Sequence, residues 1–239
     1  MDRAIELLGQ ECLAAKPRAS VIDFGAGFCD LPIRLAERFG SEVVAVELGA
    51  RMASLARERI RSRLIECSNP PHAGGVTVHE GDAGRFRAQI TDHSFDAGIC
   101  IGSSHALGGF SNMLDVLGRL VRPRGCVLLG EGFWERAPDA QALARTPISM
   151  DEFMSLPGVV DEVQAAGFVP LWVVSATPRE WDEYEWTHQR TLERFASTRT
   201  DEPEARKLLS RGRTWREHYI NALRGRLGFA LVLARRAEP

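Results

Sequence analysis

The chain has 239 residues, of which 44% are hydrophobic and 26% charged, and 30 basic against 32 acidic side chains give a formal net charge of -2. This composition is typical of a globular protein with a sizeable core, and the missing basic excess argues against binding of nucleic acid through its phosphates. The sequence predicts no membrane span and no secretory signal at its N-terminus.

Five cysteines make an odd count without a C-x-x-C pair, which disfavours a disulfide framework. Most of them lie in or beside apolar segments, where a free thiol packs as a small hydrophobic group. We therefore predict a reducing, cytoplasmic setting. The five residues are Cys12, Cys29, Cys67, Cys100 and Cys126.

Short segments rich in Val and Ile alternate with longer amphipathic segments along the chain, a pattern typical of a mostly parallel α/β sheet. We expect a doubly wound, Rossmann-like sheet of seven strands with helices on both faces. The predicted strands are residues 20–24, 42–47, 76–80, 95–101, 125–130, 168–175 and 227–234.

Two stretches depart from this alternation, residues 135–156 after the fifth strand and residues 178–220 before the last one. We expect both to be insertions that form a helical cap. The prediction is thus a single domain over residues 1–239 that carries a cap.

The first predicted strand leads directly into the turn Gly25-Ala26-Gly27, and a helix is expected from Asp30. Glycines let a ligand approach the backbone closely, and free N–H groups at a helix start favour electronegative groups. The nicotinamide fingerprint requires a third glycine at position 30, where the charge of Asp30 would face a pyrophosphate. A nicotinamide-dependent oxidoreductase is therefore only a third alternative, and an ordinary turn without a ligand is also compatible with these residues.

Acidic residues mark the ends of the first three predicted strands: Asp23, Glu47 and Asp82. Glu47 stands where a doubly wound nucleotide site places a carboxylate on ribose hydroxyls, since a carboxylate accepts from both. Taken singly, Glu47 and Asp82 are equally well explained as helix N-caps. The three acids together favour a ligand that contains a nucleoside.

With these motifs, residues 19–130 resemble the class I S-adenosylmethionine-dependent methyltransferases, and the cap resembles the helical lid of bacterial small-molecule members. The resemblance implies S-adenosylmethionine as cofactor. In it, Asp23 and residues 25–27 hold the methionine part, Glu47 the ribose and Asp82 the adenine amino group, while Cys29 replaces a usual third glycine. The other implied cofactor contacts are Ala83, Leu48 and Met52 around adenine, and Cys100, Ile101 and Gly102 under the sulfonium.

Residues just past the fourth and fifth strands are expected to face the transferred methyl group, because ligands bind at the carboxyl ends of strands. His105 is the candidate general base, although it also fits a helix cap. The aromatic segment 178–188 either packs on the core or encloses a small acceptor. In the second case its rings would face a sulfonium or a cationic acceptor. The candidate acceptor contacts are Ser103, Ser104, Glu131, Trp134, Trp181, Tyr184 and His188.

The sequence thus predicts an enzyme that transfers a methyl group from S-adenosylmethionine to N or O of a small-molecule acceptor by in-line displacement. No His, Cys and Asp spacing predicts a metal. We expect neither nucleic acid nor membrane as partner, and a monomer or a homodimer. The alternative is a non-catalytic partner or sensor protein with the same fold, whose expected sign is a degraded cofactor turn.

Overall fold

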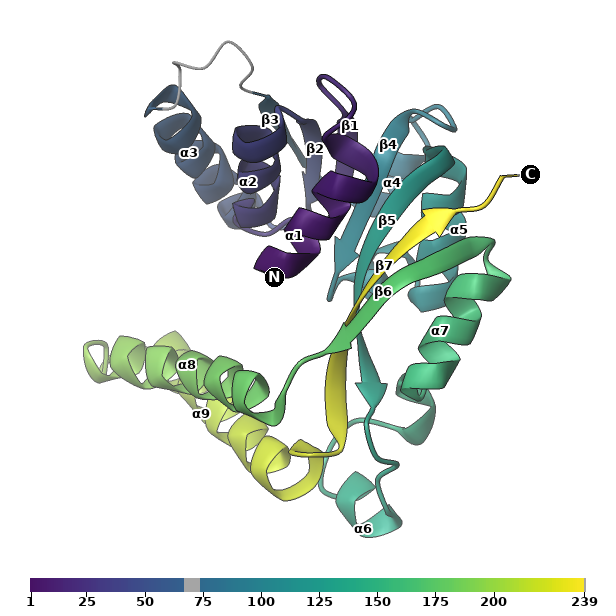
Figure 1. The fold of residues 1–239 in the computed structure, drawn as a ribbon. Helices are drawn as coiled ribbons and strands as arrows, with labels where there is room; N and C mark the ends of the chain where they lie inside the picture. The colour runs from purple at the N-terminus through teal and green to yellow at the C-terminus, as the bar shows by residue number, and fades with distance from the viewer. Residues whose placement is uncertain (67–73, 239) are drawn as a thin grey trace. The chain divides into compact units, whose positions relative to one another are not determined.

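The computed structural model describes residues 1–66 and 74–238, whose helices and strands are shown in Figure 1. Cys67 lies outside these residues, and the other four cysteines have free, buried thiols. The chain divides into two compact units. Unit 1 comprises Met1–Glu131, Val160–Val174 and Leu231–Pro239, and unit 2 comprises Gly132–Val159 and Ser175–Ala230.

Seven strands form one sheet in the order β3-β2-β1-β4-β5-β7-β6. The pairs β1–β2, β1–β4, β2–β3 and β4–β5 are parallel. The direction of winding reverses between β1 and β4, which makes their carboxyl ends the expected ligand crevice of the sheet. The strands are β1 Ser20–Phe24, β2 Glu42–Glu47, β3 Gly75–Glu80, β4 Phe95–Ile101, β5 Val121–Trp134, β6 Phe168–Ser175 and β7 Leu227–Arg236.

The predicted doubly wound, seven-stranded and mostly parallel sheet is confirmed, and four of the seven strands have the predicted bounds. The fifth strand differs most, because it begins at Val121 rather than at residue 125. Its register against β4 shifts between Phe95 and Ala97, which accommodates the extra residues around Pro123. Proline cannot donate a hydrogen bond to a neighbouring strand, so the sequence around Pro123 is typical of a turn. In the structure it is an irregularity within β5.

Helices cover both faces of the sheet in unit 1. Alternate residues of β4 point to opposite sides: Ala97 and Ile99 pack in a core cluster with Leu35 of α2. Gly98 faces α5, since a Cβ at this position would lie 2.8 Å from Cδ2 of Leu117. The helices are α1 Asp2–Leu8, α2 Asp30–Phe39, α3 Ala50–Glu66, α4 Ala83–Arg87, α5 Phe110–Leu120, α6 Ala140–Leu143, α7 Leu156–Ala165, α8 Pro178–Ser197 and α9 Pro203–His218, with the short turns η1 Gly9–Leu13, η2 Ser104–Leu107, η3 Met150–Glu152 and η4 Tyr219–Leu223.

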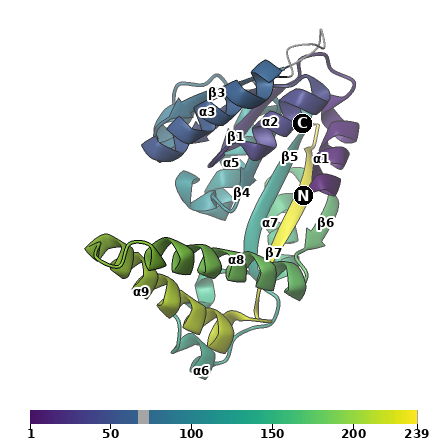
Figure 2. The same ribbon diagram turned by 90° about the vertical axis from the view of Figure 1, so that its left-hand side faces the viewer.

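Unit 2 contains both segments that the sequence marks as insertions. Within it, α8 and α9 lie side by side as an antiparallel pair (Figures 1 and 2). A buried cluster that includes Trp134, Ile148, Tyr219 and Leu223 forms the core of this unit. Its role as a cap remains a prediction.

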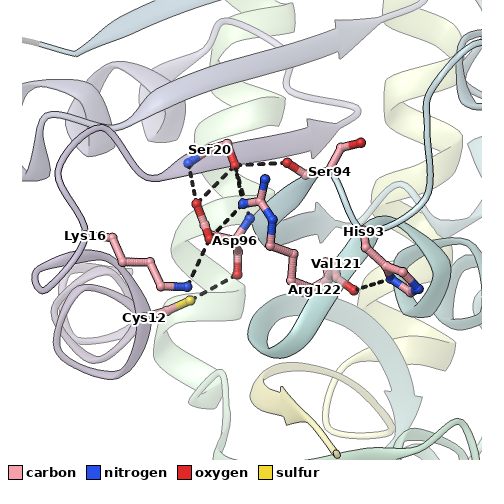
Figure 3. A network of polar contacts seen from close by, with 8 residues as sticks. All are labelled: Cys12, Lys16, Ser20, His93, Ser94, Asp96, Val121 and Arg122. Carbon is pink, nitrogen blue, oxygen red and sulfur yellow. Dashed lines mark hydrogen bonds and ion pairs between the residues drawn. The ribbon is translucent and has the colours of Figure 1, made fainter. Parts of the chain in front are cut away.

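The buried carboxylate of Asp96 connects the amino ends of β1 and β4 (Figure 3). These ends lie opposite the carboxyl ends, where the ligand crevice is expected. Asp96 accepts hydrogen bonds from Lys16 Nζ at 2.9 Å and from the backbone N–H of Ser20 at 2.9 Å. Arg122 forms an ion pair with it at 2.8 Å. Burial raises the pKa of Asp96, but the contacts from Ser20, Lys16 and Arg122 together lower it to about 2. The cluster therefore joins the strands as a structural ion-pair network.

None of the helices in the described residues combines the length and the apolar character that a membrane span needs.

Candidate functional site

The turn after β1 is folded against the end of β2. The N–H groups of Gly25 and Ala26 both donate to the carbonyl of Val46, at 2.9 and 3.2 Å. Gly25 and Gly27 have φ values of 74° and 55°, in the left-handed region where a Cβ is strained. Two positive φ values within three residues explain why this turn contains glycines.

Cys29 takes the third left-handed position of this turn, with a φ of 58°. Its buried side chain packs in an apolar cluster with Ile33 of α2, Ala45 of β2 and Ala56 of α3. Burial and the nearby charges of Asp23 and Glu47 raise the pKa of its thiol to about 12, which keeps it protonated. Cys29 thus preserves the turn that glycine usually makes, and packing offsets the backbone strain.

Glu47 joins the turns after β1 and β2. Its Oε2 accepts from the N–H of Gly27 at 3.0 Å, and its Oε1 accepts from the N–H of Gly49 at 2.8 Å. Each carboxylate oxygen has a second lone pair, so both oxygens can still accept from neighbouring hydroxyls. Leu48 beside it is 70% exposed, and Met52 lies half-buried one turn into α3. This arrangement fits a ribose next to an apolar adenine wall.

Asp23 is a buried carboxylate with only 4% of its surface exposed. Among the described residues none donates a hydrogen bond to its side chain or forms an ion pair with it. Burial, and then the charge of Glu47, raises the pKa of Asp23 to about 8. Burial, and then the charges of Asp23 and Glu131, raise the pKa of the Cys100 thiol. Three carboxyl groups therefore lie toward the carboxyl ends of β1, β2 and β5, and this arrangement suits a cationic ligand.

Asp82 caps α4, since its Oδ1 accepts from the N–H of Arg85 at 2.8 Å. The interpretation of Asp82 as a helix N-cap is therefore confirmed. A contact with adenine would use its other carboxylate oxygen, Oδ2. The preceding Gly81 donates to the carbonyl of Glu47 at 3.0 Å, which places the end of β3 beside the end of β2. Ala83 is buried at the start of α4.

The segment after β4 approaches the turn after β1. A Cβ on Gly25 would lie 2.2 Å from Oγ of Ser103, so the two residues are in direct contact. Ile101 precedes them half-buried, and Gly102 has a φ of 65°. Ser104 is buried, and its carbonyl accepts from the N–H of Gly109 at 3.0 Å. Residues 102–104 therefore lie beside the turn after β1.

His105 lies on the short turn η2 with an exposed side chain. The N-cap of the next helix, α5, is Gly109, so the alternative that His105 caps this helix is wrong. No described residue makes a hydrogen bond to its ring. His105 is therefore a solvent-accessible imidazole two residues from the Ser103 contact with the cofactor turn.

Asp30 makes a different contact from the one its position suggests. Its carboxylate pairs with Arg59 of α3 at 2.7 Å, so its charge is partly neutralised. Asp30 therefore does not present a free charge to a pyrophosphate, and its charge alone does not exclude a nicotinamide cofactor.

The other predicted acceptor contacts divide between the two units. Glu131 belongs to unit 1, where its charge acts on Cys100. Trp134 of unit 2 is 6% exposed and donates from Nε1 to the carbonyl of Met150 at 2.9 Å, so it is a core residue of that unit. The remaining three line one groove of unit 2, and they are Trp181, Tyr184 and His188.

Three residues of that groove are absent from the predicted site: Glu185, Trp215 and Leu227. The helical spacing of Glu185 from Trp181 and His188 is the signal that points to it. Trp215 and Leu227 have no such signal, because they join the groove from α9 and β7. The described residues contain no group of three or more His, Cys, Asp or Glu side chains placed to hold a metal ion.

Comparison with known proteins agrees with this geometry. Residues 21–125 match a family model described as a methyltransferase domain. In this domain and in its fold, the chain is similar to the class I S-adenosylmethionine-dependent methyltransferases. The cofactor of this class is S-adenosylmethionine.

Related proteins cover nearly the whole chain. YjhP of Escherichia coli strain K12 is 24% identical over 225 residues, which are 92% of this chain and 87% of YjhP. The crystal structure of YjhP has a TM-score of 0.83 at 21% identity and covers 100% of this chain and 93% of its own. A Geobacter sulfurreducens methyltransferase in complex with S-adenosylhomocysteine has a TM-score of 0.82 at 22% identity, with coverage of 98% and 90%.

The residues of this chain fit S-adenosylmethionine as a cofactor. The uncompensated carboxylate of Asp23 suits the cationic methionine part, and Glu47 retains acceptor capacity for the ribose. The left-handed Gly25 and Gly27 keep the turn free of side chains. Asp82 and Leu48 would then hold the adenine.

We expect Glu47→Ala and Asp82→Asn each to weaken binding of S-adenosylhomocysteine by about ten- to a hundredfold, as measured by isothermal titration. Loss of one charged acceptor typically costs about 1.5–3 kcal/mol. Asn is chosen at position 82 because it still caps a helix, so α4 keeps its cap. Glu42→Ala is the matched control, since Glu42 lies at the amino end of the same strand. Wild-type affinity in both site variants would place the cofactor elsewhere.

We expect the stability of the unliganded protein to fall as the pH rises from about 4 to 8. The folded protein keeps the proton on Asp23 up to a pKa of about 8, whereas the ordinary value for the unfolded chain is 3.8. Between these values the folded state binds one more proton, so raising the pH favours unfolding, and the effect levels off above pH 8. Urea unfolding across this range measures it.

Asp23→Asn removes this titration and is expected to flatten the slope relative to the wild type. Parallel curves for the two proteins would contradict a raised pKa of Asp23. Because a bound cation favours the charged carboxylate, cofactor binding at pH 7 is also expected to release a proton. Titration in two buffers of different ionisation enthalpy detects that proton.

Proposed function

We propose that this protein transfers a methyl group from S-adenosylmethionine to a nitrogen or oxygen atom of a small-molecule acceptor, with His105 as the general base. The observation that carries the proposal is the contact between Gly25 and Ser103. It joins the turn expected to hold the cofactor to the segment that contains His105, both within unit 1.

The cofactor supplies a methyl group on a sulfonium, which already has a good leaving group. The protein then needs to align a nucleophile in line with the methyl carbon and to remove its proton. Ser103 and Ser104 would orient the acceptor, while the Nδ1 or Nε2 atom of His105 takes the proton from its N–H or O–H group. The new bond forms from the acceptor atom to the methyl carbon as the carbon–sulfur bond breaks.

The state of the cofactor turn supports an enzyme over the non-catalytic alternative. A protein that has lost the cofactor would be expected to show a degraded turn, and Cys29 is the residue that suggests one. In this chain Cys29 keeps the left-handed conformation, and Glu47 keeps its bonds to the turn.

The test has two steps. Isothermal titration with S-adenosylmethionine and S-adenosylhomocysteine is expected to show binding of both, and no binding at millimolar levels would remove the proposal. A library of small amines, alcohols and acids is then incubated with protein and methyl-labelled cofactor. Label is expected in one class of N or O acceptor. Cofactor binding without any labelled product would favour the partner or sensor alternative.

A further inference from the structure

Unit 2 contains a groove of about 350 Å³, which we call the aromatic groove. It is lined by one face of α8, by one residue of α9 and by the start of β7, so every contributor lies within unit 2. The lining residues are Trp181, Tyr184, Glu185, His188, Trp215 and Leu227.

Glu185 is the unusual member of this lining. Its side chain is buried, with 5% exposed, and its Oε2 accepts from Nε1 of Trp215 at 2.9 Å. No ion pair joins it to any residue that the structure describes. Burial raises its pKa, against the hydrogen bond from Trp215 and the nearby His188. A buried carboxylate normally has a cationic partner, and among the described residues the only basic side chain noted near this one is that of His188.

The other acids that α8 directs toward α9 and η4 are differently placed. Asp182 is paired with Arg224 through two bonds of 2.8 and 2.7 Å. Glu193 is likewise paired with Arg213, at 2.9 and 2.8 Å. The carboxylates of Asp182 and Glu193 are more exposed than that of Glu185. Water already stabilises an exposed carboxylate, so it depends less on a basic partner than a buried one does. The acid that most needs a positive charge is therefore the one without a Lys or Arg.

Aromatic rings line the groove together with this carboxylate. Trp181 stacks on Tyr184 with ring centroids 5.6 Å apart, and on Phe229 at 6.2 Å. Tyr184 is 65% exposed, which leaves the edge of the stack accessible from solvent. The Nε1 atom of Trp181 is buried without a hydrogen-bond partner, so the lining has a second polar group that the chain does not satisfy.

The groove has a rigid frame. The Asp182 and Glu193 pairs fasten α8 to η4 and α9 on either side of Glu185, and Tyr219 adds a hydrogen bond of 2.7 Å to Asp182. A capping box formed by Thr177 and Glu180 fixes the start of α8. A preorganised carboxylate loses little conformational freedom when a ligand binds.

We infer that the aromatic groove binds a small organic cation, a protonated or quaternary amine, with its charge on Glu185 and its carbon surface against Trp181, Tyr184 and Trp215. Ring faces attract cations, and a desolvated carboxylate adds the opposite charge. This inference concerns binding within unit 2, and it holds whether or not the bound cation is the methyl acceptor.

Benzylamine and benzyl alcohol are suitable probes because they have nearly the same shape and differ in charge. By isothermal titration without cofactor, we expect benzylamine to bind at least tenfold more tightly than benzyl alcohol. Glu185→Gln keeps an acceptor for Trp215 but removes the charge, and it is expected to abolish this preference. Glu183→Gln on the exposed side of α8 is the matched control and is expected to retain it.

Tyr184→Ala provides a variant whose fold is not at risk, since this side chain is exposed. We expect it to weaken benzylamine at least threefold, with an unchanged circular dichroism spectrum. The proposal is overturned if benzylamine does not bind, if it binds no better than benzyl alcohol, or if the Glu183 and Glu185 variants lose the same affinity.

A second titration separates a free organic cation from the sulfonium of the cofactor. S-adenosylmethionine is cationic at sulfur and S-adenosylhomocysteine is not, and we expect Glu185→Gln to leave the ratio of their affinities unchanged. A ratio that shifts at least fivefold would assign the groove to the cofactor and overturn the proposal. Cofactor binding is tested separately with the variants of unit 1. If the aromatic groove does not bind benzylamine, the proposal of methyl transfer is therefore unaffected.

Discussion

His105→Ala is expected to lower turnover by about a hundredfold or more while the affinity for S-adenosylhomocysteine stays near that of the wild type. General-base catalysis typically contributes factors of this size, and the loss appears in kcat when the interaction is made in the transition state. Steady-state kinetics with the acceptor that the labelling screen finds measure the turnover, and isothermal titration measures the affinity.

His105→Gln distinguishes a base from a positioning group. Gln can hydrogen-bond to the acceptor but cannot take its proton, so a base predicts that this variant is as slow as His105→Ala. If the imidazole only positions the acceptor, the KM rises instead and Gln restores much of the activity. Wild-type kcat and KM in His105→Ala would show that the residue has no part in the reaction.

Gly25→Val is expected to lose cofactor binding altogether. The position has a φ of 74°, and a Cβ there would lie 2.2 Å from Oγ and 2.3 Å from Cβ of Ser103. A branched side chain would therefore displace the segment that leads to His105, and the left-handed conformation adds strain of about 1–2 kcal/mol. Isothermal titration with S-adenosylhomocysteine measures the loss, and thermal unfolding shows whether the variant folds.

Two further variants isolate the contact with Ser103. Gly27→Ala has similar strain, with a φ of 55°, but its Cβ would have no atom within 4 Å, so we expect it to bind the cofactor within about tenfold of the wild type. Gly25→Ala should bind more weakly than Gly27→Ala, and adding Ser103→Gly should recover part of the loss by making room. Normal binding by Gly25→Val would show that the contact does not shape the cofactor site.

Local sequence patterns predicted much of the sheet. The runs that form β1, β2, β4 and β6 begin and end where the structure has them, because hydrophobic periodicity and nearby glycines act over a few residues. The turn after β1 was recognisable for the same reason. The start of the fifth strand was not, since Pro123 and Gly125 normally end an element, whereas β5 begins at Val121 and continues through both residues with a shifted register against β4.

The sequence by itself determined the strands, the glycine turn and the acids at the strand ends, because each depends on residues that are close along the chain. Only the tertiary structure decided what these residues contact. It placed Ser103 against Gly25, joined Glu47 to the turn after β1, and buried Glu185 beside Trp215 with no ion pair to a Lys or Arg of the described residues. Those contacts join residues distant in sequence, and their energies depend on burial and distance, which a linear pattern does not contain.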